Sequence, residues 1–249
     1  MSEAPAAAFY ARGGSRAADW LTVLHPPYTA WHLGYVAIGA ALAPQIDWSV
    51  CWLSLVGFLL AVGIAAHALD EWNGRPLGTA ISSRALWTAA VLSLAAAVLL
   101  GLLVLRHSGF ALIPFIAVGV VLVLGYNLEL FGGALHTDLG FAAAWGGFPL
   151  AVGYVAQGPR WSLAGTVALV FGVLAATGLS AAQRRLSTPA RELRRRAVAV
   201  TGRIELADGE QRVLDRDALL EPLDGALKLL SAVVPLLAAA LLLARWAGR

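Results

Sequence analysis

Charged residues are scarce in this sequence, and cysteine is almost absent. Asp, Glu, Lys and Arg make up 13% of the 249 residues, about half the usual share of a soluble globular domain. Hydrophobic residues make up 59%, and a soluble core of this size could not hide that much apolar surface from water. Cys51 is the single cysteine and lies inside an apolar run, which excludes internal disulfides and a thiolate metal site. The net charge of +3 is too small to indicate a nucleic-acid partner.

Seven apolar stretches are long enough to cross a bilayer, because a spanning helix needs about 20 mostly apolar residues. They lie near residues 28–44, 49–69, 86–105, 110–127, 139–157, 162–181 and 225–246. Tryptophan residues stand at or near the ends of these stretches, as in the aromatic belts of membrane proteins: Trp20, Trp31, Trp48, Trp52, Trp87, Trp161 and Trp246. We therefore expect an all-α fold, a polytopic bundle of about seven spans that forms one membrane domain over residues 1–249. Its partner is then the lipid bilayer.

The basic residues predict the orientation of the chain. The first 20 residues lack a long apolar core, so we expect no cleavable signal peptide. With the N-terminus in the cytoplasm, 14 of the 18 Lys and Arg residues lie on the cytoplasmic side, as the positive-inside rule favours. Without residues 182–224, five of the remaining Lys and Arg residues lie on the cytoplasmic side and four lie outside. We expect an integral protein of the plasma membrane with its C-terminus outside.

One long polar segment, residues 182–224, interrupts the apolar pattern. Its first part, QRRLSTPARELRRR, is interpreted either as a basic helix lying on anionic headgroups or as a flexible, soluble loop. Its second part, VTGRIELADGEQRVLD, has apolar alternation on either side of Asp208-Gly209, which suggests a short hairpin. We expect this loop to be cytoplasmic.

A first group of ionisable residues lies at the cytoplasmic end of the second stretch, in AAHALDEWNGRPLGT. His67, Asp70 and Glu71 stand at positions i, i+3 and i+4, so they project from one helix face. Carboxylates at a helix C-terminus are disfavoured by the helix dipole, and a bound cation would reverse that penalty. The alternative is that these residues are solvated charges at the level of the lipid headgroups.

A second group follows the fourth stretch, around GYNLELFGGALHTDLG. Tyr126 and Glu129 share a helix face, and His136 and Asp138 come just before the fifth stretch, where Thr137 or Asp138 is expected to cap the helix. Four of the five histidines thus fall on one membrane face: His25, His32, His67 and His136. Histidine together with Asp and Glu suits Mg, Mn, Fe or Zn, but the spacing matches no strict metal motif.

The chain resembles the UbiA superfamily of intramembrane prenyltransferases from about His25 to Gly158. The run HPPYTAWHLGYVAIGAALA is similar to the family's first helix, and RPLGTAIS follows the acidic end of the second helix, as in the family. The run GYNLELFGG…LGFAAAWGGFPLAVGY is similar to the stretch that joins the family's fourth and fifth helices.

This resemblance implies a lipid-soluble substrate and a divalent metal. In the family, two Asp-rich motifs hold Mg²⁺ against the diphosphate of a polyprenyl donor. Here either His67 and Asp70 occupy an Asp-x-x-Asp spacing, or Asp70 is the final Asp of the first motif, with Val62, Gly63 and Ala66 at the earlier positions. Tyr126 fits the family's tyrosine, and AQRRLSTPARELRRR replaces the second motif. The candidate metal ligands are His67, Asp70, Glu71, Glu129, His136 and Asp138. The candidate catalytic residues are Asp70, Glu71, Tyr126 and Glu129. The candidate substrate-binding residues are Asn73, Arg75, Arg84, Asn127 and Trp145.

Three functions therefore stay open at this point. The first is a divergent enzyme of prenyl transfer or cyclisation, with Mg²⁺ as the metal that the resemblance implies. The second is a lipid-modifying and redox-capable enzyme that holds Fe, Mn or Zn through histidine and carboxylate ligands. The third is a non-catalytic lipid-binding membrane subunit. In the enzymatic readings, residues 67–71 and 126–138 should converge on one cytoplasm-facing cavity.

Overall fold

The computed structural model describes residues 8–12, 14–158 and 161–248, and this part of the chain is mostly helical. The α-helices are α1 (Arg16–Val23), α2 (Pro26–Leu42), α3 (Trp48–Phe58), α4 (His67–Trp72), α5 (Ser83–Ser108), α6 (Ile113–Asn127), α7 (Asp138–Ala142), α8 (Phe148–Ala156), α9 (Leu163–Arg195) and α10 (Arg216–Ala247). Two π-helical segments, η1 (Leu59–Ala66) and η4 (Ala143–Gly147), continue α3 into α4 and α7 into α8. Two short 3₁₀ turns are η2 (Gly109–Leu112) and η3 (Phe131–Gly133).

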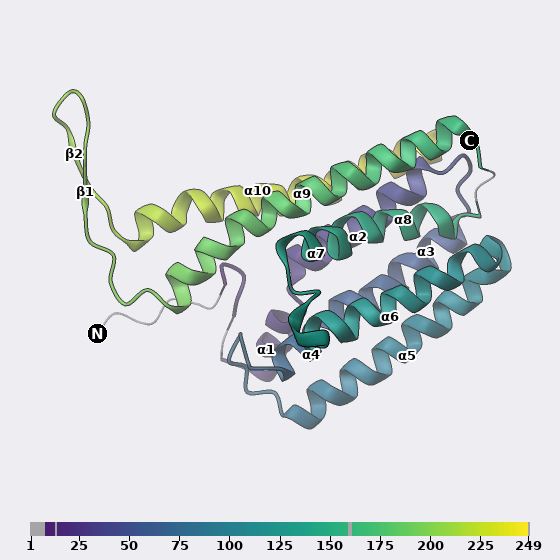
Figure 1. The fold of residues 1–249 in the computed structure, drawn as a ribbon, viewed down its shortest axis with the longest axis horizontal. Coiled ribbons are helices and arrows are strands. Elements are labelled where there is room, and N and C mark those ends of the chain that lie inside the picture. Colours follow the sequence, from purple (N-terminus) through teal and green to yellow (C-terminus); the bar gives the residue numbers. More distant parts are fainter. Residues whose placement is uncertain (1–7, 13, 159–160, 249) are drawn as a thin grey trace.

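Five helical stretches are long and apolar enough to cross a membrane. They are Trp48–Trp72, Ser83–Asn127, Asp138–Ala156, Leu163–Arg195 and Arg216–Ala247. The prediction of a helical membrane protein is confirmed at this level. The number differs from seven for two reasons. α2 has only 17 residues, and the 45-residue stretch Ser83–Asn127 holds both α5 and α6, which run back along each other after a turn at η2 (Figure 1).

Side-chain caps fix where several helices begin. A cap accepts a hydrogen bond from an N–H group of the first turn, which has no partner within the helix. This is done by Ser15, Asp47, Ser82, Thr137, Ser162 and Asp215. Thr137, and not Asp138, is therefore the cap of α7.

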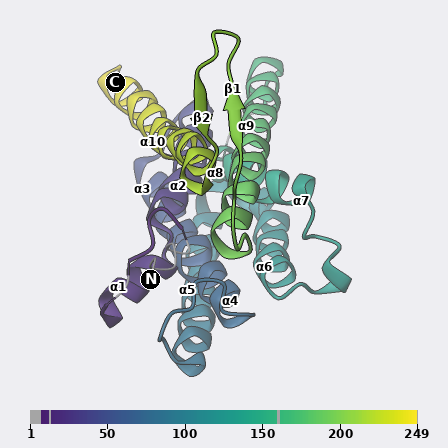
Figure 2. The ribbon, with the colours of Figure 1, turned by 90° about the vertical axis from the view of Figure 1, so that its left-hand side faces the viewer.

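In the segment 182–224, the structure contains the helix that one of the two sequence interpretations expected and also the expected hairpin, and the helix is continuous with α9. Residues through Arg195 continue α9 despite Pro189, and α10 already begins at Arg216. The reason is packing, because Ala190 of α9 is buried against Leu220 and Leu227 of α10. Between the two helices, β1 (Arg203–Glu205) and β2 (Gln211–Val213) pair antiparallel in a hairpin that projects beyond the bundle (Figures 1 and 2).

The bundle has two ends, which we call the hairpin end and the opposite end. The hairpin end carries α1, α4, the start of α7 and the last turns of α9 (Figure 1). At the opposite end, Arg245 near the end of α10 donates hydrogen bonds to the carbonyl groups of Ala43 and Pro44. The Asp47 N–H donates to Gln157 there, at 2.8 Å. The segments that connect successive long helices therefore lie alternately at the hairpin end and at the opposite end.

Candidate functional site

A polar cavity of about 260 Å³ lies at the hairpin end. Its walls come from α2, the η1–α4 segment, the end of α6, η4 and the last turns of α9, together with residues that precede α1. Nine ionisable side chains other than tyrosine line it: four histidines, four arginines and one carboxylate. They are His25, His32, His67, His136, Arg184, Arg191, Arg194, Arg195 and Asp70. Residues separated by up to 170 positions in the chain therefore meet in one site.

Three of the histidines pack between α2, η1–α4 and η4. His25 precedes α2 in the left-handed conformation, with φ 45° and ψ 57°. Its ring stacks on that of His67 at a centroid distance of 4.2 Å, and His67 Nδ1 lies 3.3 Å from the Gly63 carbonyl. His32 Nδ1 lies 2.7 Å from the carbonyl oxygen of Trp145. This last contact ties the first and fifth predicted spans together at the cavity.

His25 keeps one polar atom without a partner. Its Nε2 atom is buried and forms no hydrogen bond with any residue that the structure describes. Burial lowers the pKa of His25 well below its ordinary value, and the neighbouring His67 and Arg195 lower it further. A neutral imidazole with one unused nitrogen therefore faces the cavity, where it can donate to or accept from a ligand, depending on its tautomer.

An aromatic group forms another part of the wall. The ring of Tyr126 stacks on that of His136 at 4.5 Å, and the Trp145 ring meets Tyr126 edge to face at 5.5 Å. Asn73 Nδ2 donates to the backbone carbonyl of Asn127 at 3.0 Å, which joins the ends of α4 and α6. The Asn127 side chain donates to the Val123 carbonyl at 2.7 Å. Of the predicted site residues, His67, Asp70, Tyr126, Asn127, His136 and Trp145 line the cavity.

Glu71 has a different environment. It is fully buried, and its carboxylate accepts hydrogen bonds from the Leu77 N–H (2.9 Å) and from both the N–H and the hydroxyl of Thr79 (2.8 Å each). Three donors hold both of its oxygens on the turn after α4, so Glu71 organises that turn and does not line the cavity.

The remaining predicted residues also lie outside the cavity lining. Arg75 donates to the Ile81 carbonyl at 2.5 Å and to Ser83 Oγ at 2.8 Å, so it braces the same turn, while Arg84 is exposed. The Glu129 side chain is 62% exposed and lies 4.0 Å from His136. The Asp138 side chain is 80% exposed and pairs with Arg184 at 3.1 Å.

These positions bear on the expected metal. Magnesium requires several oxygen ligands, and only Asp70 among the predicted carboxylates lines the cavity. In the described part of the chain, no three His, Cys, Asp or Glu side chains are arranged to hold a metal ion. One carboxylate in the lining is too few for a resident magnesium ion.

The four cavity arginines were not predicted as site residues. The sequence interpretation placed them on a surface helix or loop because a run with Pro189 and few apolar residues follows the sixth stretch. The spacing of the arginines in the sequence could have indicated that they share a site. Arg184, Arg191 and Arg195 are seven and four residues apart, which is one face of a continuous helix.

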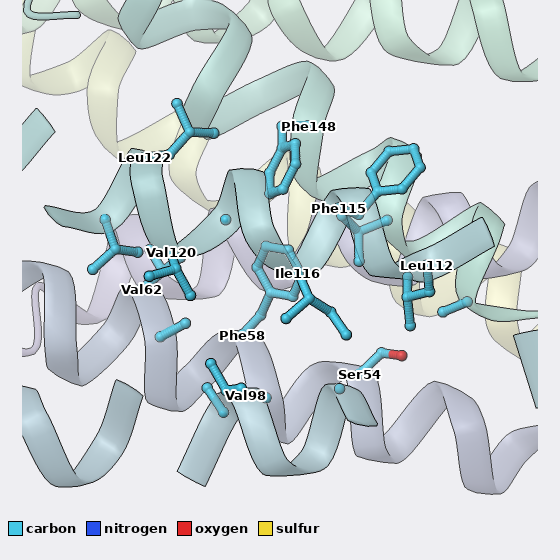
Figure 3. Close-up of a pocket in the computed structure, with 18 of the residues that line it drawn as sticks. Ser54, Phe58, Val62, Val98, Leu112, Phe115, Ile116, Val120, Leu122 and Phe148 are labelled. Atoms are coloured by element: carbon cyan, nitrogen blue, oxygen red, sulfur yellow. The ribbon is translucent and has the colours of Figure 1, made fainter. Parts of the chain in front are cut away.

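A second pocket, of about 100 Å³, lies beside the polar cavity and is almost wholly apolar. Figure 3 shows side chains of α3, η1, α5, η2, α6 and α8 that converge on it, among them Phe58, Ile116 and Phe148. Ser54 carries the only oxygen among the labelled side chains. Val62 and Trp145 line both this pocket and the polar cavity. The two spaces are therefore neighbours that share a wall.

Comparison of the chain with known protein families, with curated proteins and with solved structures found no significant match.

Proposed function

We propose that this protein is an intramembrane enzyme of the UbiA type that acts on an amphiphile with an anionic head group and an isoprenoid chain. The single observation that carries the proposal is that Val62 and Trp145 line both a cationic, polar space and an apolar one, so the two spaces are adjacent. An isoprenoid diphosphate has the same division into a charged head and an apolar chain. Burial of each part in matching surroundings favours binding, at roughly 25 cal/mol for each Å² of apolar surface removed from water.

The reaction that we propose is prenyl transfer or cyclisation. The bond between the first carbon of the chain and the diphosphate oxygen breaks, and the electron pair stays on the diphosphate. The resulting allylic cation is attacked by an acceptor molecule, which then loses a proton, or by a double bond of the same chain, after which the cyclised cation loses a proton to form a new double bond. We assign the stabilisation of this cation to the rings of Tyr126 and Trp145, which meet edge to face in the cavity lining, because aromatic rings attract cations by about 0.5–2 kcal/mol each.

In a bilayer, we propose that α2, α5 and α6 each cross the membrane separately, which gives seven spans. From the distribution of basic residues we propose that the hairpin end, with its cavity, faces the cytoplasm and that the protein lies in the plasma membrane. This orientation brings the head-group cavity to the side on which soluble diphosphates are found.

The experiment uses full-length protein in vesicles with a radiolabelled prenyl diphosphate. We expect release of diphosphate together with a new apolar product. Trp145→Ala should reduce the turnover strongly, because the Trp145 side chain lines both spaces and would contact both parts of the substrate. Trp161→Ala is the matched control, since that side chain is 58% exposed and lines neither the polar cavity nor the apolar pocket. Binding without turnover would favour a lipid-binding subunit, and absence of both would contradict the proposal.

A further inference from the structure

We propose that the cavity holds the phosphate or diphosphate of its ligand directly through arginine side chains of α9, centred on Arg191, without a divalent metal. The inference rests on the proposed function only for the apolar part of the ligand. The anion chemistry follows from the residues that line the cavity.

The geometry of α9 places several guanidinium groups in one space. Arg184, Arg191 and Arg195 recur on one helix face, and Arg194 also lines the cavity. The opposing charge within the lining is a single carboxylate, Asp70. The cavity is therefore electropositive, which favours an anion over a cation.

Two of these arginines are held in place by carboxylates from neighbouring elements. Arg184 Nε lies 3.1 Å from Asp138 at the start of α7, and Arg194 forms an ion pair with Asp224 of α10. Neither Asp138 nor Asp224 lines the cavity. The two pairs thus fix the walls around the cavity and add no negative charge to its lining.

Arg191 is different, because no carboxylate of the described residues lies within ion-pair distance of it. Its side-chain hydrogen bond is with Thr188 Oγ1, at 3.4 Å, on its own helix. Asp70 interacts electrostatically with Arg191 from beyond ion-pair distance, so it compensates this guanidinium only in part. A partly buried and incompletely compensated guanidinium is costly, and an anion in the cavity relieves that cost.

The chemistry of the available donors fits phosphate. A guanidinium presents two parallel N–H donors to two phosphate oxygens, an arrangement that an ammonium group cannot reproduce. The unpartnered, buried Nε2 of His25 supplies one more donor when it carries the proton. Arg191 and His25 come from α9 and from the residue before α2, so they approach the cavity from different helices.

The test measures binding to full-length protein in nanodiscs by calorimetry, with inorganic pyrophosphate and geranyl diphosphate as probes. Each titration is made in EDTA and again in magnesium. We expect both probes to bind in EDTA, and Arg191→Gln to weaken both by about 10- to 100-fold, as for loss of a charge-assisted hydrogen bond. Arg191→Lys should recover only part of that loss. Arg185→Gln, an exposed residue of the same helix outside the cavity, should bind like the wild type.

Each outcome separates the inference from the proposed function. If binding requires magnesium, or if Arg191→Gln binds both probes normally, the inference is overturned and the proposed function is unaffected. If pyrophosphate binds through Arg191 in EDTA but geranyl diphosphate gains nothing from its chain, the inference stands and the proposed function fails. If Arg191→Gln does not fold, His25→Asn gives the second measurement, with weaker pyrophosphate binding expected.

Discussion

The imidazole ring of His25 stacks on that of His67, with centroids 4.2 Å apart and ring planes inclined by 26°. The two residues come from the start of α2 and the start of α4, so the stack joins the ends of two helices at the polar cavity. A proton on His25 would place a positive charge against a second imidazole and close to Arg195. The neutral form of this histidine is therefore part of the folded structure.

Folding stability should depend on pH through His25. Its pKa lies well below the ordinary value of about 6.5, first because of burial and then because of His67 and Arg195. Below about pH 6.5 the unfolded chain binds a proton at His25 that the folded chain does not. The contribution of His25 to the free energy of unfolding is therefore fully present above this pH and is lost as the pH falls. Thermal unfolding of the purified protein at about pH 7.5 and about pH 5 measures this loss.

His25→Asn is the variant that checks this prediction, because asparagine tolerates the left-handed conformation at this position. It should show a smaller loss of stability at low pH than the wild type. His107→Asn, at the opposite end with a half-exposed side chain, is the matched control and should leave the loss unchanged. Equal losses in His25→Asn and the wild type would refute the assignment.

The crossing of α2 and α8 depends on two glycines. A Cβ atom on Gly39 would overlap the carbonyl oxygen of Leu150, and one on Gly153 would overlap that of Val36. Small residues allow such close approach of helices in membranes. We expect Gly39→Ala to lower the free energy of unfolding by about 1–3 kcal/mol, as overpacking does.

Gly178 in α9 provides the control for that measurement. A Cβ atom there would meet no described heavy atom within 4 Å, and alanine is the better helix former. Gly178→Ala should therefore match or slightly exceed the wild type in a thermal unfolding assay. Equal stability of the Gly39→Ala and Gly178→Ala variants would show that the α2–α8 contact is looser than described.

The ion pair of Arg194 and Asp224 should stabilise the hairpin end of the bundle. Both side chains are largely buried, and removal of one partner leaves the other charge buried and unpaired. Asp224→Asn should cost up to about 3–5 kcal/mol in unfolding free energy, and the added Arg194→Gln should restore part of it. Glu210→Gln, in the exposed pair with Arg212, should cost no more than about 1 kcal/mol. If Asp224→Asn and Glu210→Gln lower the unfolding free energy equally, the buried pair stabilises the protein no more than the exposed one.

The proposed orientation predicts opposite accessibility of two cysteines. Cys51 is buried and can be replaced by alanine to give a background without a native thiol. In that background, an impermeant maleimide should label Glu205→Cys, in β1, from the cytoplasmic side and Gly248→Cys from the outside. Labelling of both from the same side would contradict an odd number of spans.

The apolar helices could be predicted from the sequence, because runs of about 20 apolar residues determine membrane helices largely by themselves. The continuity of residues 183–195 with the apolar part of α9 could not be predicted in this way. Pro189 and the arginine run are typical of a helix terminus, whereas burial of Ala190 against Leu220 of α10 extends the helix. That contact depends on where α10 returns in space, which no local pattern in α9 reveals.

The site shows the same limit. His67, Asp70, Tyr126 and His136 could be assigned to one cavity from their positions at helix ends, while the metal role of His67, Asp70 and His136 and the catalytic role of Tyr126 stay predictions. Glu71 has the same spacing signal, yet its carboxylate binds the turn formed with Arg75 and Gly78 at positive φ. Local spacing identifies polar residues on a helix face, and only the tertiary path of the chain decides which of them meet a ligand.

The central claim is that one amphiphile occupies both spaces, with its head in the polar cavity and its chain in the apolar pocket. A prenyl diphosphate with a diazirine at the chain end farthest from the diphosphate tests it directly, by crosslinking to full-length protein in nanodiscs and peptide mass spectrometry. The account predicts crosslinks to pocket residues of α5 and α6 such as Val98 and Ile116, and their loss with excess unlabelled compound. Crosslinks confined to exposed apolar residues such as Phe171 and Leu174 of α9 would contradict it.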